Sequence, residues 1–174
     1  MAKKKKQKAN KKTPVAKVNL QELRESRDGG QIALRGYSYQ FLYSCNLILS
    51  SDTDTVFTLE GIEDIDIDTI KCSDSNKVIT HIQLKYSTER QDASFMDSVL
   101  KNYLEAYLID KNRHFKLVYD FSVAAGNLSK LFSGNLDKNS KEFWKTKIDN
   151  IKKETSLWNW SNFDFEDFIQ RLSF

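Results

Sequence analysis

The feature that most constrains the fold of this chain is an alternation of aspartate and isoleucine over residues 64–70. Successive side chains of a β-strand point to opposite faces, so the alternation predicts a strand with one acidic face and one apolar face. A β-rich stretch over residues 55–60 precedes it, and an apolar run over residues 78–85 follows a polar turn at residues 73–76. Together these segments predict three consecutive strands in a meander.

Helical periodicity flanks the predicted strands. Apolar residues recur at mostly helical intervals over residues 31–50, where we expect a largely buried first helix. Residues 94–110 carry apolar side chains three and four apart, with Asp92 or Ser94 available as an N-cap. The sequence therefore predicts an α/β fold in the order helix, three-strand meander, helix, strand, with extra C-terminal helices. The later predicted elements are a strand at 114–125 and helical segments at 128–132, 141–153 and 164–172.

Charge divides the chain into an arm and a body. The net charge of +3 hides eight lysines without any acid in the first 17 residues, which leaves 19 basic against 24 acidic residues elsewhere. Such a block is normally disordered and binds phosphate without reading sequence. We interpret residues 1–28 as a disordered arm, either solubilising or nucleic-acid-binding. The lysines that would contact nucleic acid are Lys3, Lys4, Lys5, Lys6 and Lys8.

The remaining composition indicates a single soluble domain with a core at residues 29–126 and a helical extension at 127–174. No apolar run is long enough to span a bilayer, so no membrane partner is expected. The N-terminus lacks the features of a secretion signal. Two cysteines, Cys45 and Cys72, are too few for a disulfide framework, which favours a reducing cytoplasm. Because the last residues form an amphipathic segment, we expect one module of a longer protein or complex.

The polar residues of the meander form a candidate metal site. Gln83 and Lys85 share one face of their strand while Leu84 points to the other. Asp64, on the neighbouring strand, would be the principal ligand of Mg²⁺ or Mn²⁺, and the side-chain oxygen of Gln83 and the carbonyl of Leu84 would add ligands. The metal would lower the pKa of an attacking water, and Lys85 would stabilise developing negative charge. Further candidates to hold the metal or its waters are Glu60, Gln40 and Asp66.

Each of these residues also has a structural interpretation. An alternating acidic face is ordinarily a solvated sheet face, and Gln40 is equally expected to make a core hydrogen bond. His81 is expected to be a satisfied packing residue rather than a catalytic one. Three tryptophans lie outside the predicted core, where a docking surface for another subunit is the expected role. They are Trp144, Trp158 and Trp160.

Three stretches, residues 35–40 (RGYSYQ), 59–65 (LEGIEDI) and 82–85 (IQLK), carry a family resemblance. With the predicted element order, they resemble the restriction-endonuclease-like PD-(D/E)xK nuclease core over residues 31–125. Within it, the chain looks like the double-stranded DNA endonuclease domain of bacterial anti-phage effectors. These include nucleases associated with cyclic-oligonucleotide signalling and the nuclease subunit of Lamassu-type systems.

The resemblance implies a metal-dependent DNA endonuclease of low sequence specificity that acts as a defence effector. It also implies control by oligomerisation or by a regulatory partner subunit. One alternative is a catalytically inert nuclease fold used for nucleic-acid binding or assembly, favoured by Gln83 in a position where relatives often have an acid. A further alternative is an RNA nuclease.

Overall fold

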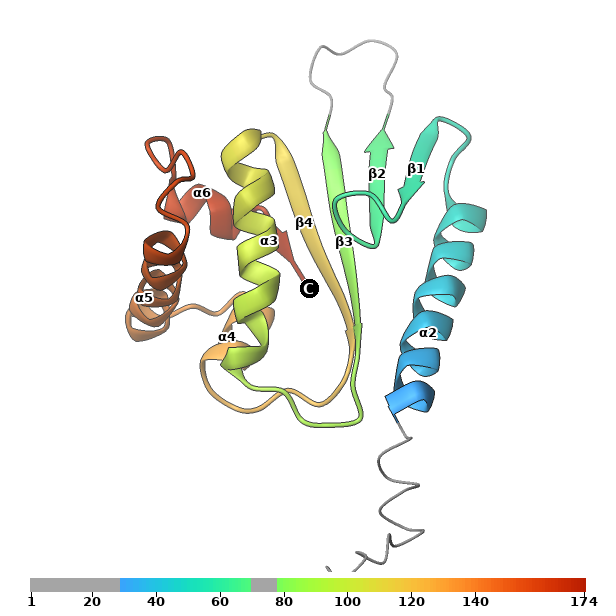
Figure 1. The fold of residues 1–174 in the computed structure, drawn as a ribbon, viewed down its shortest axis with the longest axis horizontal. Coiled ribbons are helices and arrows are strands. Elements are labelled where there is room, and N and C mark those ends of the chain that lie inside the picture. Colours follow the sequence, from blue (N-terminus) through green and yellow to red (C-terminus); the bar gives the residue numbers. More distant parts are fainter. Residues whose placement is uncertain (1–28, 70–77) are drawn as a thin grey trace, which may run out of the picture. The chain divides into compact units, whose positions relative to one another are not determined.

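The computed structural model describes residues 29–69 and 78–174 (Figure 1). The predicted arm at 1–28 and the turn at 73–76 lie outside the described residues. Residues Leu34–Phe174 form one compact unit. This unit is a mixed α/β structure around a five-stranded mixed sheet, and all packing described below lies within it.

The strands lie in the sheet in their sequence order, β1-β2-β3-β4-β5. Both pairings among β1 (Thr55–Leu59), β2 (Ile65–Thr69) and β3 (Ile79–Tyr86) are antiparallel, which confirms the predicted meander. Strand β4 (Arg113–Asp120) lies parallel to β3, as the crossover through a helix allows. The two-residue strand β5 (Leu172–Ser173) pairs in parallel with β4.

Helices lie on both faces of this sheet (Figure 1). On one side, α2 (Gly29–Ser50) places Tyr39, Tyr43 and Leu47 against a small core of Ile65, Ile82 and Leu84. On the other side, α3 (Met96–Ile109) contributes to the larger core, in which Tyr103 stacks on Phe115 of β4 with ring centroids 4.8 Å apart. The predicted opposition of Leu84 to its neighbours in β3 is confirmed, because Leu84 belongs to the α2 side.

Aspartates begin the later helices. Asp92 accepts a hydrogen bond from the Ser94 N–H at the short helix η1 (Ala93–Phe95), directly before α3. Asp137 caps α5 (Lys138–Glu154) and Asp164 caps α6 (Phe165–Gln170) in the same way. These caps give the C-terminal helices defined starts. The remaining helix within the described residues is α4 (Asn127–Phe132).

The segment 127–174 belongs to the core as well as to the surface. It supplies β5, and its Trp144, Trp160 and Phe168 are buried in the same cluster as Phe115. The expectation of a tryptophan docking surface is therefore wrong: Trp144 is 1% exposed, and Trp158 packs against the cluster. Periodicity missed this because a core divided between a sheet and several short helices has no single repeat.

The expectation of a largely buried first helix is also wrong. In α2, the side chains of Phe41 and Leu49 are 68% and 86% exposed. Only one side of the helix faces the sheet, whereas its sequence is apolar on two sides. Among the described helices, none is long and apolar enough to cross a bilayer. Cys45, on α2, is a free cysteine, and Cys72 lies outside the described residues.

Candidate functional site

A strained turn connects β1 to β2 and positions the candidate site. Glu60 adopts a left-handed backbone with φ of 54°, which is uncommon for a residue with a side chain. At Gly61, an added Cβ would lie far inside van der Waals contact with the carboxylate of Asp66. The Ile62 N–H donates to Asp66 Oδ2 at 2.9 Å, which ties the turn to β2. The turn therefore fixes where the two acids that follow it, Glu63 and Asp64, are placed.

Asp64 precedes β2 rather than lying in it, because β2 begins at Ile65. Its Oδ1 accepts a hydrogen bond from Gln40 Nε2 at 2.9 Å, and its Oδ2 accepts one from the Leu84 N–H at 2.6 Å. Gln40 thus makes the hydrogen bond that was one of its two expected roles, and Leu84 reaches Asp64 through its N–H. The predicted principal ligand has both carboxylate oxygens hydrogen-bonded to the protein.

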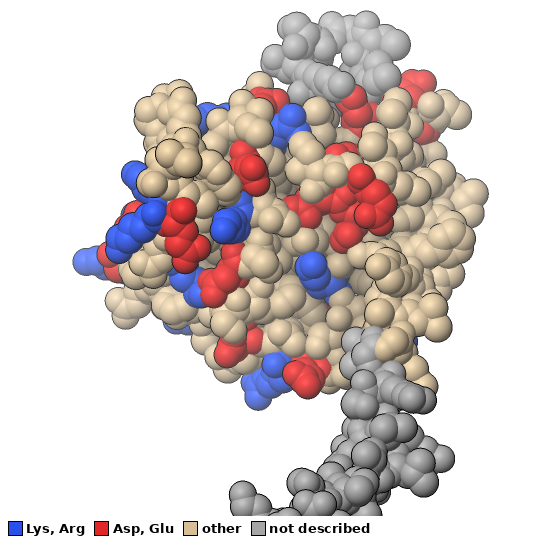
Figure 2. All heavy atoms as spheres, viewed as in Figure 1, with Lys and Arg blue, Asp and Glu red and all other residues tan. Residues whose placement is uncertain are grey.

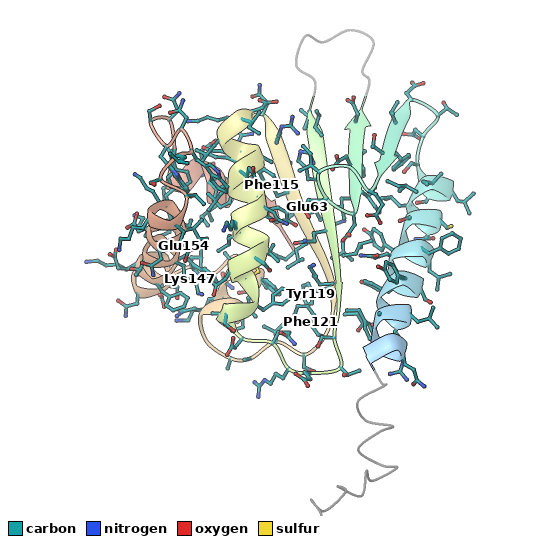
Figure 3. The ribbon with its side chains drawn as sticks, in the orientation of Figure 1. Glu63, Phe115, Tyr119, Phe121, Lys147 and Glu154 are labelled. Atoms are coloured by element: carbon teal, nitrogen blue, oxygen red, sulfur yellow. The ribbon has the colours of Figure 1, made fainter. Side chains whose placement is uncertain are left out.

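Glu63 is the acid that sequence reasoning missed. Figure 3 shows it on the α3 side of β3, and its side chain is only 7% exposed. Burial raises the pKa of its carboxyl to about 7, with the neighbouring charge of Asp64 in the same direction and that of Lys85 opposing. Its Oε1 is buried without a hydrogen-bond partner. The signal in the sequence was its position beside Asp64 in the quoted Glu-Asp pair.

Gln83 resembles Glu63 in its burial and in its unpartnered oxygen. It is also 7% exposed, and its Oε1 is likewise buried without a hydrogen-bond partner. Both residues lie close to Tyr103 of α3, whose hydroxyl donates to the Lys116 carbonyl at 3.0 Å. Burial raises the pKa of Tyr103, and the charge of Glu63 and the main chain of Gln83 also act on it. Tyr103 therefore lies near both the carboxyl of Glu63 and the main chain of Gln83.

Asp66, the alternative metal ligand, is one end of a chain of hydrogen bonds that runs through His81 to Arg113. Its Oδ1 lies 2.6 Å from Nδ1 of fully buried His81, and Arg113 Nη1 lies 2.7 Å from His81 Nε2. Because a guanidinium can only donate, His81 accepts at Nε2 and donates from Nδ1 to Asp66. Its ring also stacks on Phe115. The expectation that His81 is a satisfied packing residue is confirmed, and the oxygens of Asp66 are engaged by His81 and the turn.

The remaining predicted site residues, Lys85 and Glu60, have different surroundings. Lys85 is half-buried near the end of β3, and its charge acts to lower the pKa of Glu63. Glu60 was expected at the end of a strand but lies in the turn, with an exposed side chain, and its N–H donates to the Asp64 carbonyl at 3.1 Å. The five predicted arm lysines lie outside the described residues.

The surface over this site is acidic. Figure 2 shows acidic side chains gathered over the turn and the start of β2. Among residues 29–69 and 78–174, no three His, Cys, Asp or Glu side chains converge as a metal-binding group. The buried oxygens without a hydrogen-bond partner include one carboxylate oxygen, Glu63 Oε1, and one amide oxygen, Gln83 Oε1. Both are hard ligands of the kind that Mg²⁺ accepts alongside water.

In comparisons with protein-family models, with curated proteins and with solved structures, nothing matches this chain.

Proposed function

We propose that this chain is a metal-dependent phosphodiesterase that cuts DNA, with its site at Glu63, Gln83 and Lys85 beside Asp64. The observation that carries the proposal is the pair of buried oxygens, Glu63 Oε1 and Gln83 Oε1, that have no hydrogen-bond partner. A buried polar atom without a partner costs free energy, on the order of 1–3 kcal/mol, more if it is charged. A divalent cation held between these oxygens would offset that cost.

The donor set fits a hard cation. Mg²⁺ takes oxygen ligands and retains several waters, so one carboxylate and one amide oxygen suffice when phosphate and water complete the shell. Bound Mg²⁺ or Mn²⁺ would neutralise charge on the scissile phosphate and supply a water of lowered pKa. Glu63 and Gln83 would hold the ion, and Asp64, whose charge acts on Glu63, is a further oxygen source that the sequence nominated.

The protein's own residues would position the phosphate. Lys85 would bring its ammonium to the phosphate oxygens and stabilise the negative charge that develops there. The hydrogen bonds that Gln40 and Leu84 donate to Asp64 would keep the turn against α2 and β3 respectively. These contacts keep the site residues in fixed orientations, which is a main source of rate acceleration in phosphoryl transfer.

The acidic surface bears on the substrate. A bare acidic rim repels the DNA backbone, so binding would require the metal, the lysine-rich arm, or both. A restriction-endonuclease-like core, a role as effector of a bacterial defence system and control by association with other subunits are parts of the same proposal. They are supported by the resemblance of residues 35–40, 59–65 and 82–85.

A second candidate function, a catalytically inert nuclease fold that binds nucleic acid or assembles with partners, is favoured by a specific observation. Both oxygens of Asp64 accept hydrogen bonds from the protein. Because these hydrogen bonds use lone pairs of both oxygens, fewer lone pairs of Asp64 remain to bind a metal. In this alternative the arm would bind DNA with a steep dependence on salt, and no hydrolysis would follow.

Cleavage of supercoiled plasmid in Mg²⁺ or Mn²⁺ separates the two functions. The wild-type chain is compared with Lys85→Ala and with Lys138→Ala, a matched change of an exposed lysine at the start of α5. The proposal predicts metal-dependent nicking that Lys85→Ala reduces at least ~100-fold, as loss of a charge-stabilising group does, and that Lys138→Ala leaves intact. Salt-sensitive binding without nicking would favour the inert fold, and competition with RNA identifies the preferred nucleic acid.

A further inference from the structure

Helix α2 has an apolar face that points away from the sheet. We call this its outer face, and its residues are exposed by between 42% and 86%. They are Leu34, Tyr37, Phe41, Leu42, Ile48 and Leu49. The opposite side of the same helix carries Tyr39, Tyr43 and Leu47, which pack on the sheet. A helix that is apolar on both sides is normally buried on both sides.

The spacing of the outer face suits contact with another helix. Leu34, Phe41 and Ile48 follow one another at intervals of seven residues, as do Leu42 and Leu49. A seven-residue apolar repeat keeps one seam of a helix against a partner helix over its length. A flat or irregular partner would not need such a repeat.

The charge of the helix limits the kind of partner. Over Gly29–Ser50, Arg35 is the one charged residue. Nucleic acid would require a row of cations, and helices that lie on lipid surfaces carry lysines and arginines beside their apolar face. An uncharged surface instead meets its own copy without repulsion between like charges, because a two-fold axis places the same residues on both sides.

The size of the outer face approaches what a dimer needs. Its two aromatic and four aliphatic side chains, each between 42% and 86% exposed, offer on the order of 600 Å² of apolar surface. Monomers leave contiguous apolar patches of about 300–600 Å², and a standard interface buries about 800 Å² per partner. The outer face therefore supplies about three quarters of one partner's share, and the residues that border it on α2 would supply the rest.

We propose that two copies of this chain associate through the outer faces of α2 in a symmetric helix-to-helix contact. The inference rests on exposure, spacing and charge, and it does not depend on the proposed hydrolysis.

Sedimentation equilibrium of the full chain at about 50 µM tests the proposal, because an interface of micromolar Kd is populated there. The expected mass is twice the 20.2 kDa of one chain. Phe41→Glu and Leu34→Glu should each weaken the dimer at least ~10-fold by placing like charges at the two-fold contact. Leu157→Glu alters a leucine that is 99% exposed elsewhere in the unit and should leave the dimer unchanged.

Two results would overturn the proposal. One is a wild-type chain that remains monomeric at this concentration. That result would overturn the proposal even if another segment, such as residues 1–28, covered the outer face instead of a second copy. The other is a dimer that both glutamate variants retain. Circular dichroism of each variant distinguishes lost association from lost folding, and Leu34→Glu serves as the second variant if Phe41→Glu does not fold.

Discussion

Gln40 on α2 donates a hydrogen bond from Nε2 to Asp64 Oδ1 at 2.9 Å. The same carboxylate accepts the Leu84 N–H through its other oxygen, so Asp64 fastens the turn before β2 both to a helix and to the next strand. A residue nominated as a metal ligand thus has a structural role that requires no metal.

We therefore expect Asp64→Asn to destabilise the fold even when chelator removes every divalent ion. An asparagine can still accept from the Leu84 N–H, and Gln40 can turn its amide to accept from the new NH₂ group, but both hydrogen bonds then join neutral groups. Hydrogen bonds to a charged group contribute about 1.5–3 kcal/mol against about 1 kcal/mol for neutral ones, so a loss on the order of 1 kcal/mol is expected. Urea unfolding in chelator measures the loss. Asp54→Asn, at an exposed position, is the matched control and should change the free energy of unfolding by under ~0.5 kcal/mol. Equal stability of Asp64→Asn and wild type would show that the charge of Asp64 adds nothing to these bonds.

Gly61 is required by its close approach to Asp66. We expect Gly61→Ala to push the turn away from Asp66, to break the bond from the Ile62 N–H, and to cost on the order of 2 kcal/mol. Gly36→Ala is the control, because nothing lies within 4 Å of its added Cβ and alanine favours a helix by about 0.5–1 kcal/mol. Thermal unfolding of both variants gives the comparison. If Gly61→Ala were no less stable than Gly36→Ala, the turn would not have the observed geometry.

Glu63 should give the folded chain a distinct pH dependence. Its pKa is about 7 in the folded chain against an ordinary value of 4.5, so the folded chain holds an additional proton between these pH values. The free energy of unfolding should therefore fall as the pH rises from about 4.5 to about 7. We expect Glu63→Gln to lose this dependence and to be more stable than wild type at pH 8, by on the order of 2 kcal/mol.

Urea unfolding at pH 5 and pH 8 in chelator measures this effect. Glu60→Gln changes an exposed acid of the same turn and should keep the wild-type slope between the two pH values. A Glu63→Gln variant with that same slope would mean that the Glu63 carboxyl is not buried in solution.

The two histidines should differ in their tautomers. His81 accepts from Arg113 at Nε2, so its neutral ring is expected to carry the proton on Nδ1. His114 is exposed on β4 and serves as the internal comparison. Nitrogen-15 NMR at pH 8 reads the ring nitrogens directly. An Nε2-protonated His81 would contradict the chain from Asp66 to Arg113.

Much of the fold follows from periodicity in the sequence. The alternation at Asp66 and Ile67 gave the faces of β2, and the spacing of Val99, Leu100 and Tyr103 gave α3 as a packed helix. Periodicity reports how apolar residues are arranged along a segment. It does not report how many of its apolar sides the rest of the chain covers, so the exposure of α2 was missed.

The candidate site was predicted in part for a similar reason. Gln83 and Lys85 follow from the pleat of β3, but the choice between Glu63 and Asp64 depends on where β2 begins. That start is set by the left-handed Glu60 and by the contact of Gly61 with Asp66, and neither has a repeat in the sequence. Strand β5 was missed because two residues are too few to show alternation.

The most direct test of the central claim, that Glu63 and Gln83 form a cation site, is calorimetric titration of the full chain with Mn²⁺ at pH 8. The account predicts binding of one ion per chain, weakened at least ~10-fold in Glu63→Gln by loss of the anionic ligand and unchanged in Glu60→Gln. No binding by the wild-type chain, or equal affinity in Glu63→Gln, would contradict the account and leave the buried oxygens as a purely structural feature.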